Sequence, residues 1–115
     1  MDPETTWAHI RQHTAGRRIV VVTNRVDKPL KRTLESLLGT RLKWVVCRPR
    51  KISSLAQSIK HGTYDIVLAF TGWMDHKNDT VLARASSDSD TLYVRGDKGR
   101  PTAVMLALSR DLGID

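Results

Sequence analysis

The segment TGWMDHK (residues 71–77) gathers side-chain types that can bind an anionic or aromatic ligand. It follows an apolar run at residues 64–70, which is typical of a buried strand. An indole can stack on a base, an imidazole can hydrogen-bond or respond to pH, and an ammonium group can pair with phosphate. Asp75 and His76 also have simpler roles available, as the N-cap and the first turn of a following helix.

Basic residues follow the other apolar runs as well. The chain has 19 Lys and Arg against 12 Asp and Glu, a formal net charge of +7. Such a surface attracts phosphate polymers through counterion release, and it also suits acidic lipid or an acidic protein. The predicted phosphate contacts are Arg25, Lys28, Arg48, Arg50, Lys51, Lys77, Arg95, Lys98 and Arg100.

Enzyme chemistry finds little support in the sequence. No Ser lies in a nucleophile elbow, and the i, i+4 pair His9 and His13 lacks a third metal ligand. Cys47 is the single cysteine and is interpreted as a small hydrophobe at a strand end. The segments TNRVDK and RGDKGRP match neither the dinucleotide-binding nor the P-loop pattern. A phosphoacceptor receiver would need an acidic pair after the first strand, where this chain has Thr-Asn-Arg. We therefore expect no catalytic activity, no cofactor and no metal.

Four β-rich runs alternate with helical patterns and position these residues. The predicted strands are residues 18–23, 41–47, 64–70 and 91–96. Apolar residues at helical spacing, ended by Gly39 and Gly62, predict the first two connecting helices. Asp2 and Pro3 begin a leading helix that ends at Gly16, and a last helix begins at Pro101.

The alternation predicts a three-layer α/β domain with a four-stranded parallel sheet in the order 2-1-3-4, as in Rossmann-like and flavodoxin-like folds. Residues 1–16 form the N-terminal helix and residues 17–115 the α/β domain, since 115 residues suffice for one domain. No apolar stretch approaches the roughly 20 residues that span a bilayer, and the polar N-terminus does not read as a signal peptide. We expect a cytoplasmic protein with no membrane partner.

In such sheets, ligands bind beyond the carboxyl ends of the strands at the point where the strand order reverses. Here that point lies between the first and third strands. The predicted ligand-binding residues are Thr23, Asn24, Arg25, Thr71, Gly72, Trp73, Asp75 and His76.

Three segments also resemble a known family. RIVVVTNR, YDIVLAFTGWMDHKNDTVLARA and TLYVRGDKGRPTAVMLAL are similar to a small bacterial Rossmann-like family, domain of unknown function 2325, over about residues 18–112. That family carries Thr-Asp-x-x-x-His after the third strand; here Thr71 and His76 match, and Gly72 replaces the Asp. The turn after the first strand lacks the family's glycines. The resemblance implies a Rossmann-like fold and a bacterial source, and it implies no reaction.

The sequence therefore favours a non-enzymatic module that binds nucleic acid through the carboxyl edge of its sheet. A domain that binds a small phosphorylated ligand or nucleotide between Asn24 and His76 is one alternative. A protein-interaction module, with a homodimer formed by the leading helix around Trp7 and Ile10, is the other.

Overall fold

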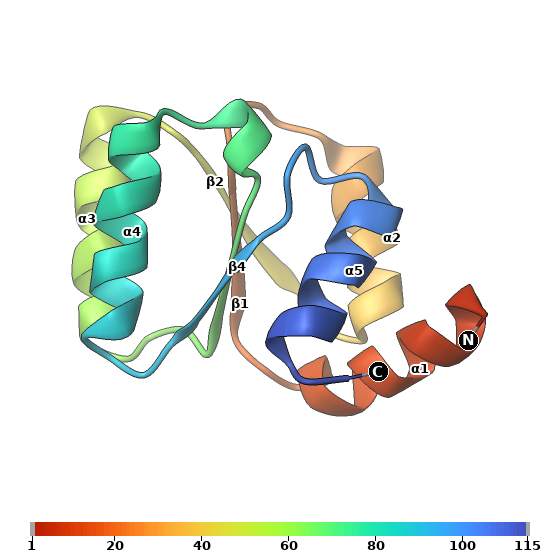
Figure 1. The fold of residues 1–115 in the computed structure, drawn as a ribbon. Helices are drawn as coiled ribbons and strands as arrows, with labels where there is room; N and C mark the ends of the chain where they lie inside the picture. Colours follow the sequence, from red (N-terminus) through yellow and green to blue (C-terminus); the bar gives the residue numbers. More distant parts are fainter. Residues whose placement is uncertain (1, 115) are drawn as a thin grey trace.

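The chain folds into three layers, with a parallel sheet between two layers of helices (Figure 1). The computed structural model describes residues 2–114. The strands are β1 (Ile19–Thr23), β2 (Leu42–Val46), β3 (Ile66–Ala69) and β4 (Leu92–Arg95). The helices are α1 (Pro3–Thr14), α2 (Lys28–Leu38), α3 (Pro49–Lys60), α4 (His76–Ser87) and α5 (Pro101–Asp111), and a 3-10 turn η1 (Thr71–Trp73) follows β3. Each strand lies within two residues of its predicted bounds.

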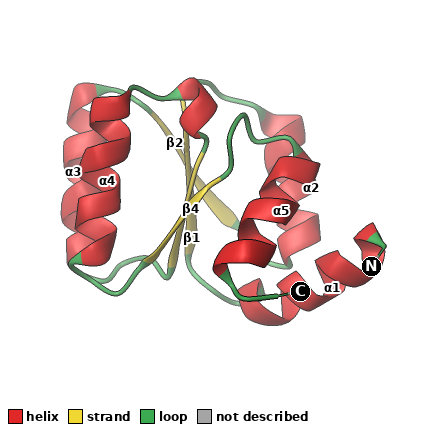
Figure 2. Cartoon of the chain, in the orientation of Figure 1, coloured by secondary structure: helices red, strands yellow, loops and turns green. Residues whose placement is uncertain are grey.

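The sheet has the order β2-β1-β3-β4 and all its pairings are parallel, which confirms the predicted topology. The α3 and α4 helices cover one face, and α1, α2 and α5 lie on the other (Figures 1 and 2). The chain therefore leaves β1 toward one layer and β3 toward the opposite layer. That divergence creates the crevice at the carboxyl edge in which ligands bind in folds of this kind.

The alternating side chains of the central strands build two separate cores. Ile19 and Val21 point into the core shared with α1, α2 and α5, while Val20 and Val22 point into the core shared with α3 and α4. All four are between 0% and 2% exposed, as a strand covered on both faces requires. This alternation places the next residue of β1, Thr23, on the α2 and α5 side.

The leading helix belongs to the larger of these cores. Trp7 and Ile10 are 8% and 0% exposed and pack with residues of β1, α2 and α5. These two side chains, which the sequence offered as a dimer contact, are thus used inside one copy of the chain. Within residues 2–114, no helix is both long and apolar enough to cross a membrane.

The amino edge of the sheet is held by Asp65, which precedes β3. Its carboxylate accepts a hydrogen bond from the backbone N–H of Arg18 at 2.8 Å, and the Arg18 guanidinium lies 3.1 Å from its other oxygen. The hydrogen bonds from this guanidinium and backbone N–H hold the pKa of the Asp65 carboxyl below its ordinary value. The contact links the starts of β1 and β3.

We expect Asp65→Asn to lower the free energy of unfolding at pH 7 by about 1 kcal/mol, a value typical of one hydrogen bond and a partly exposed ion pair. A carboxyl whose pKa is lowered by folding stabilises the protein above its unfolded pKa of about 3.9, and that contribution is lost as the pH falls through the folded pKa. The urea midpoints of wild type and variant should differ at pH 7 and converge below about pH 4. A difference that persists undiminished in strong acid would contradict this account.

Candidate functional site

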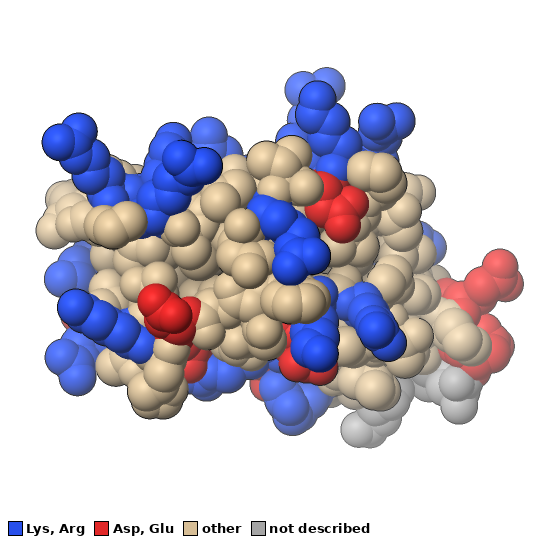
Figure 3. All heavy atoms as spheres, turned by 90° about the horizontal axis from the view of Figure 1, so that it is seen from above, with Lys and Arg blue, Asp and Glu red and all other residues tan. Residues whose placement is uncertain are grey.

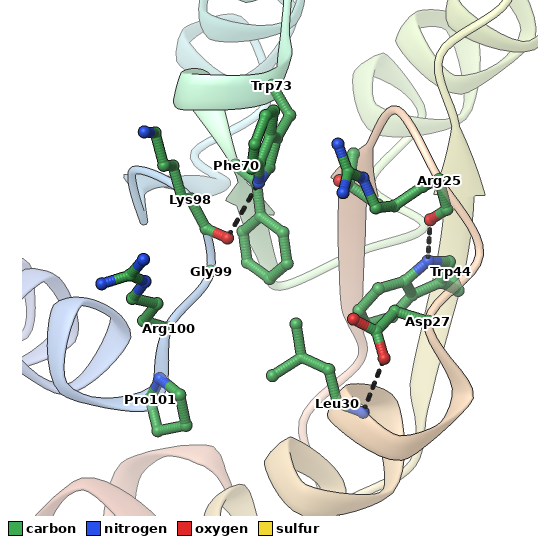
Figure 4. Close-up of a pocket in the computed structure, with 11 residues that line it drawn as sticks. Arg25, Asp27, Leu30, Trp44, Phe70, Trp73, Lys98, Gly99, Arg100 and Pro101 are labelled. Carbon is green, nitrogen blue, oxygen red and sulfur yellow. Dashed lines mark hydrogen bonds between the residues drawn. The ribbon is translucent and has the colours of Figure 1, made fainter.

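A cavity of about 280 Å³ opens at the carboxyl edge, on the side of the sheet covered by α2 and α5 (Figure 4). The β1–α2 and β4–α5 loops flank it, and the ends of β1, β2 and β3 lie behind it. Its lining residues are Thr23, Arg25, Asp27, Leu30, Trp44, Phe70, Trp73, Lys98, Gly99, Arg100 and Pro101. The cavity therefore lies where the strand order reverses, as the topology predicted.

Aromatic rings form the inner walls of this cavity. Trp44 and Phe70 meet edge to face, with ring centroids 5.8 Å apart and planes at 81°. Gly99 brings the β4–α5 loop against the Phe70 ring, since a Cβ on Gly99 would lie 2.4 Å from a Phe70 ring carbon. Gly99 also has φ +81°, a conformation that favours glycine. Both constraints make the cavity depend on glycine at this position.

Two indole N–H groups tie down the loops at the rim. Trp44 Nε1 donates to the carbonyl oxygen of Arg25 at 2.9 Å, which holds the β1–α2 loop against β2. Trp73 Nε1 donates to the carbonyl oxygen of Lys98 at 3.1 Å, which holds the β4–α5 loop against η1. Both indoles therefore use their polar atom on the protein and leave ring surface for the cavity.

Cations cover the ring of Trp73 at the mouth. The guanidinium carbon of Arg25 lies 4.1 Å from the Trp73 ring centroid, and the ammonium of Lys98 lies 5.5 Å from it. Figure 4 shows Arg25 and Lys98 on opposite sides of the indole. Arg25 is further fixed by a 3.0 Å hydrogen bond from its Nε to the side-chain oxygen of Asn24. The open stacking platform proposed for Trp73 is therefore already occupied by positive charge in this structure.

Thr23 supplies a polar group deep in the cavity. The residue is 1% exposed and its carbonyl oxygen accepts from the backbone N–H of Cys47 at 2.8 Å. Its hydroxyl takes part in no side-chain hydrogen bond within residues 2–114. Within residues 2–114, the one fully enclosed side-chain polar atom without a hydrogen-bond partner is the hydroxyl of Ser109. The Thr23 hydroxyl is therefore not fully enclosed, and it opens on the cavity that Thr23 lines.

Asp27, the acidic residue of the cavity wall, stabilises the start of a helix. Asp27 accepts a hydrogen bond from the backbone N–H of Leu30 at 3.0 Å and so caps α2. The α5 helix begins at Pro101, which lines the cavity, and the side chain of its N-cap residue, Arg100, makes no capping bond. The positive end of α5 and the side chains of Lys98 and Arg100 favour an anion at the mouth.

Basic side chains extend over the rest of this edge. Figure 3 looks onto it and shows Lys and Arg spread across the face with few acids between them. Within residues 2–114, ion pairs join Arg18 to Asp65, Arg95 to Asp79 and Arg110 to Asp111. The remaining predicted phosphate contacts in this part of the chain form no ion pair; they are Arg25, Lys28, Arg48, Arg50, Lys51, Lys77, Lys98 and Arg100.

Arg95 differs from these cations because it already has an acidic partner. Asp79 accepts hydrogen bonds from Arg95 Nε at 3.2 Å and from the Tyr93 hydroxyl at 2.7 Å. Burial, followed by the hydrogen bond to Asp79, raises the pKa of Tyr93 far above its ordinary value. This cluster joins α4 to β4, and Arg95 is a weaker candidate for phosphate than its neighbours.

The segment at residues 71–77 divides between two places. Trp73 lines the cavity, whereas Asp75 and His76 are exposed at the start of α4 and are absent from its lining. Asp75 occupies the N-cap position, as the sequence suggested, although its side chain accepts no capping bond. Asn24, Gly72 and Asp75 border a separate hollow of about 410 Å³. Of the predicted ligand residues, Thr23 and Arg25 thus line the cavity alone, and Trp73 borders both depressions. Thr71 and His76 border neither of them.

The single cysteine lies beside that second hollow. Cys47 is half-buried and borders the hollow together with Asp75. Burial raises the pKa of the Cys47 thiol, and the negative charge of Asp75 raises it further. A thiol held in its protonated form is a poor nucleophile. Residues 2–114 contain no group of three His, Cys, Asp or Glu side chains able to hold a metal ion.

Several cavity residues were missed by sequence reasoning. They are Asp27, Leu30, Trp44, Phe70, Gly99 and Pro101. Trp44 carried a usable signal, because the period of two along RLKWVVC puts it on the same face as the buried Leu42. Phe70 was seen only as the last residue of an apolar run. No signal in the sequence shows that Gly99 approaches it.

No protein-family model matches this sequence, and no curated protein matches it significantly. The resemblance to the domain of unknown function 2325 family therefore stays a prediction.

Proposed function

We propose that this protein is a non-enzymatic module that binds nucleic acid through the carboxyl edge of its sheet. The main support is that Arg25, Lys98 and Arg100 line a cavity with aromatic walls, at the point where the strand order reverses. None of these three cations forms an ion pair within residues 2–114. Phosphates would contact the cations, and aromatic and Arg surfaces are what bases stack on. The net charge of +7 adds a long-range attraction for any polyanion.

The chemistry of the cavity supports binding over catalysis. Its described lining holds no His, Cys or Ser, and its one carboxylate, Asp27, caps α2. A nucleophile with a neighbouring base, which acyl or phosphoryl transfer requires, is not assembled among these residues. Cytoplasmic location and a bacterial source remain part of this proposal, on the sequence grounds given above.

Replacing Lys98 and Arg100 together by Ala should weaken binding to all single strands alike. Each lost phosphate contact reduces the slope of log affinity against log salt by about 0.7 for single strands, so the double variant should lose about 1.4. The measurement is filter binding or fluorescence anisotropy over a salt series, with single-stranded DNA, RNA and duplex DNA compared.

The matched control is the double variant Arg41→Ala and Lys60→Ala. Arg41 precedes β2 and Lys60 ends α3, so both exposed cations lie at the opposite edge of the sheet. This variant loses the same charge and should keep nearly the wild-type slope. A larger loss in the control than in the Lys98 and Arg100 variant would place binding on the wrong edge. If wild type binds no nucleic acid at low salt, the proposal fails.

The aromatic walls and basic mouth of the cavity favour one second candidate, a domain that binds a free phosphorylated ligand or nucleotide. Its volume of about 280 Å³ is slightly below the range of roughly 300–1,000 Å³ found for small-molecule sites. Saturable thermal stabilisation by a mononucleotide, without salt-dependent binding of oligonucleotides, would favour this candidate. Its location would be the Thr23 to Arg100 cavity, rather than the predicted crevice between Asn24 and His76.

A further inference from the structure

We propose that the cavity receives one unstacked nucleobase, whose inner edge hydrogen-bonds to the hydroxyl of Thr23. This inference rests on the proposed function and specifies how that site reads nucleic acid. It implies that the protein prefers single strands, ends or bulges, in which a base is not held in a duplex.

The size and wall chemistry of the cavity suit one flat ring system. Its volume of about 280 Å³ is small for a dinucleotide and ample for a base with part of its sugar. Trp44 and Phe70 line its inner part with aromatic carbon. The Trp44 N–H is used by a loop carbonyl, so its ring offers apolar surface and makes no demand for a polar partner.

The Thr23 hydroxyl is the feature that points to a ligand with a polar edge. A ligand that displaces water from this cavity leaves the hydroxyl without a hydrogen bond unless the ligand itself supplies a polar partner. Thr23 is 1% exposed, and its hydroxyl has no side-chain partner in the described part of the chain. A hydroxyl both donates and accepts, so it can pair with the edge of any base. This contact would fix the depth of the base without selecting strongly among sequences.

The mouth of the cavity supplies what the rest of a nucleotide needs. Arg25 is held 4.1 Å from the Trp73 ring centroid, so its guanidinium is already supported for stacking against a base or sugar. Lys98 and Arg100 line the same cavity from the β4–α5 loop. A base inside the cavity therefore places its own phosphate beside cations and the positive end of α5.

The first test compares two single strands of about ten nucleotides, within the usual site size of small single-strand binders. One carries thymine at every position, and the other has the same phosphates and abasic sugars throughout. Wild type should bind the abasic strand about tenfold more weakly or worse, with an unchanged salt slope, because stacking contributes little to counterion release. Equal affinity for both strands would overturn the base pocket while leaving the polyanion proposal intact.

The second test removes only the hydroxyl. Thr23→Val keeps the shape of the side chain, and Thr23→Ser keeps the hydroxyl. The Val variant should bind the thymine strand several-fold more weakly, about three- to tenfold for one neutral hydrogen bond, and the abasic strand as wild type does. The Ser variant should restore binding of the thymine strand.

The outcomes separate the two proposals. If Thr23→Val weakens both strands equally, or leaves both unchanged, Thr23 does not contact a base and the inference is wrong. If wild type binds neither strand at low salt, the proposed function fails with it. Thermal melting of both Thr23 variants shows whether the fold is preserved, and the wild-type comparison of the two strands needs no variant at all.

Discussion

A chain carrying Val21→Asp is expected not to fold. Val21 is 0% exposed at the centre of β1, where its register partners are Trp44 on β2 and Leu68 on β3. An unpaired carboxylate at this point costs several kcal/mol, by order of magnitude, because no cation within the described core can pair with it. Domains of this size are stable by about 5–15 kcal/mol, so one such change removes most or all of the stability. Far-UV circular dichroism during thermal melting measures the effect.

The control for this experiment is Val26→Asp, which introduces the same charge in the β1–α2 loop. Val26 is 69% exposed, so its replacement should change the melting temperature little. A Val21→Asp protein that melts like wild type would show that β1 is not the central strand of the folded chain.

Trp73→Ala should weaken binding to single strands by about 1–3 kcal/mol, or roughly five- to 150-fold. The change removes one wall of the cavity, the indole bond that holds the Lys98 carbonyl, and the ring that supports Arg25. The salt slope should stay within about 0.7 of wild type, the value of one phosphate contact, since no charge is deleted. Anisotropy titrations at several salt concentrations give both quantities.

Trp73→Phe separates the roles of the ring and of its N–H group. Phe keeps an aromatic face for Arg25 and lacks the donor for the Lys98 carbonyl. Binding between that of wild type and that of the Ala variant would assign part of the effect to each. An Ala variant with normal melting and wild-type affinity for single strands would exclude Trp73 from the interface.

The topology was predictable because individual residues marked the central strand and the ends of the helices. The run IVVVT has no polar interruption, as only a strand covered on both faces allows, and this placed β1 at the centre of the sheet. Gly39 ends α2 with φ 70°, and Pro101 begins α5, so local backbone preferences marked these helix ends. Local signals and burial agreed throughout, and the strand order followed from them.

For the site, the sequence predicted the carboxyl edge of the sheet but not the position of the cavity along that edge. Parallel strands bring their carboxyl ends together, so Arg25, Trp73 and Lys98 were expected near one another, and the structure joins them in one cluster. The sequence did not show which side of the sheet would be hollow. That depends on Trp44 and Phe70 meeting across β1 at 5.8 Å, a contact between strands distant along the chain. His76 was expected to face a ligand together with Asn24, and it borders neither the cavity nor the neighbouring hollow.

The strand order also has a consequence for self-association. β2 and β4 each pair with one neighbour, so each has a row of backbone N–H and C=O groups on its outer side. Such rows can recruit a strand from another molecule and begin aggregation. Here the two outer strands have only five and four residues. β2 carries Lys43, an exposed cation that forms no ion pair within residues 2–114, whereas the charge of Arg95 on β4 is paired with Asp79. Charge repulsion between copies therefore protects β2 more than β4, and it weakens in concentrated salt, where the protein should be most prone to aggregate.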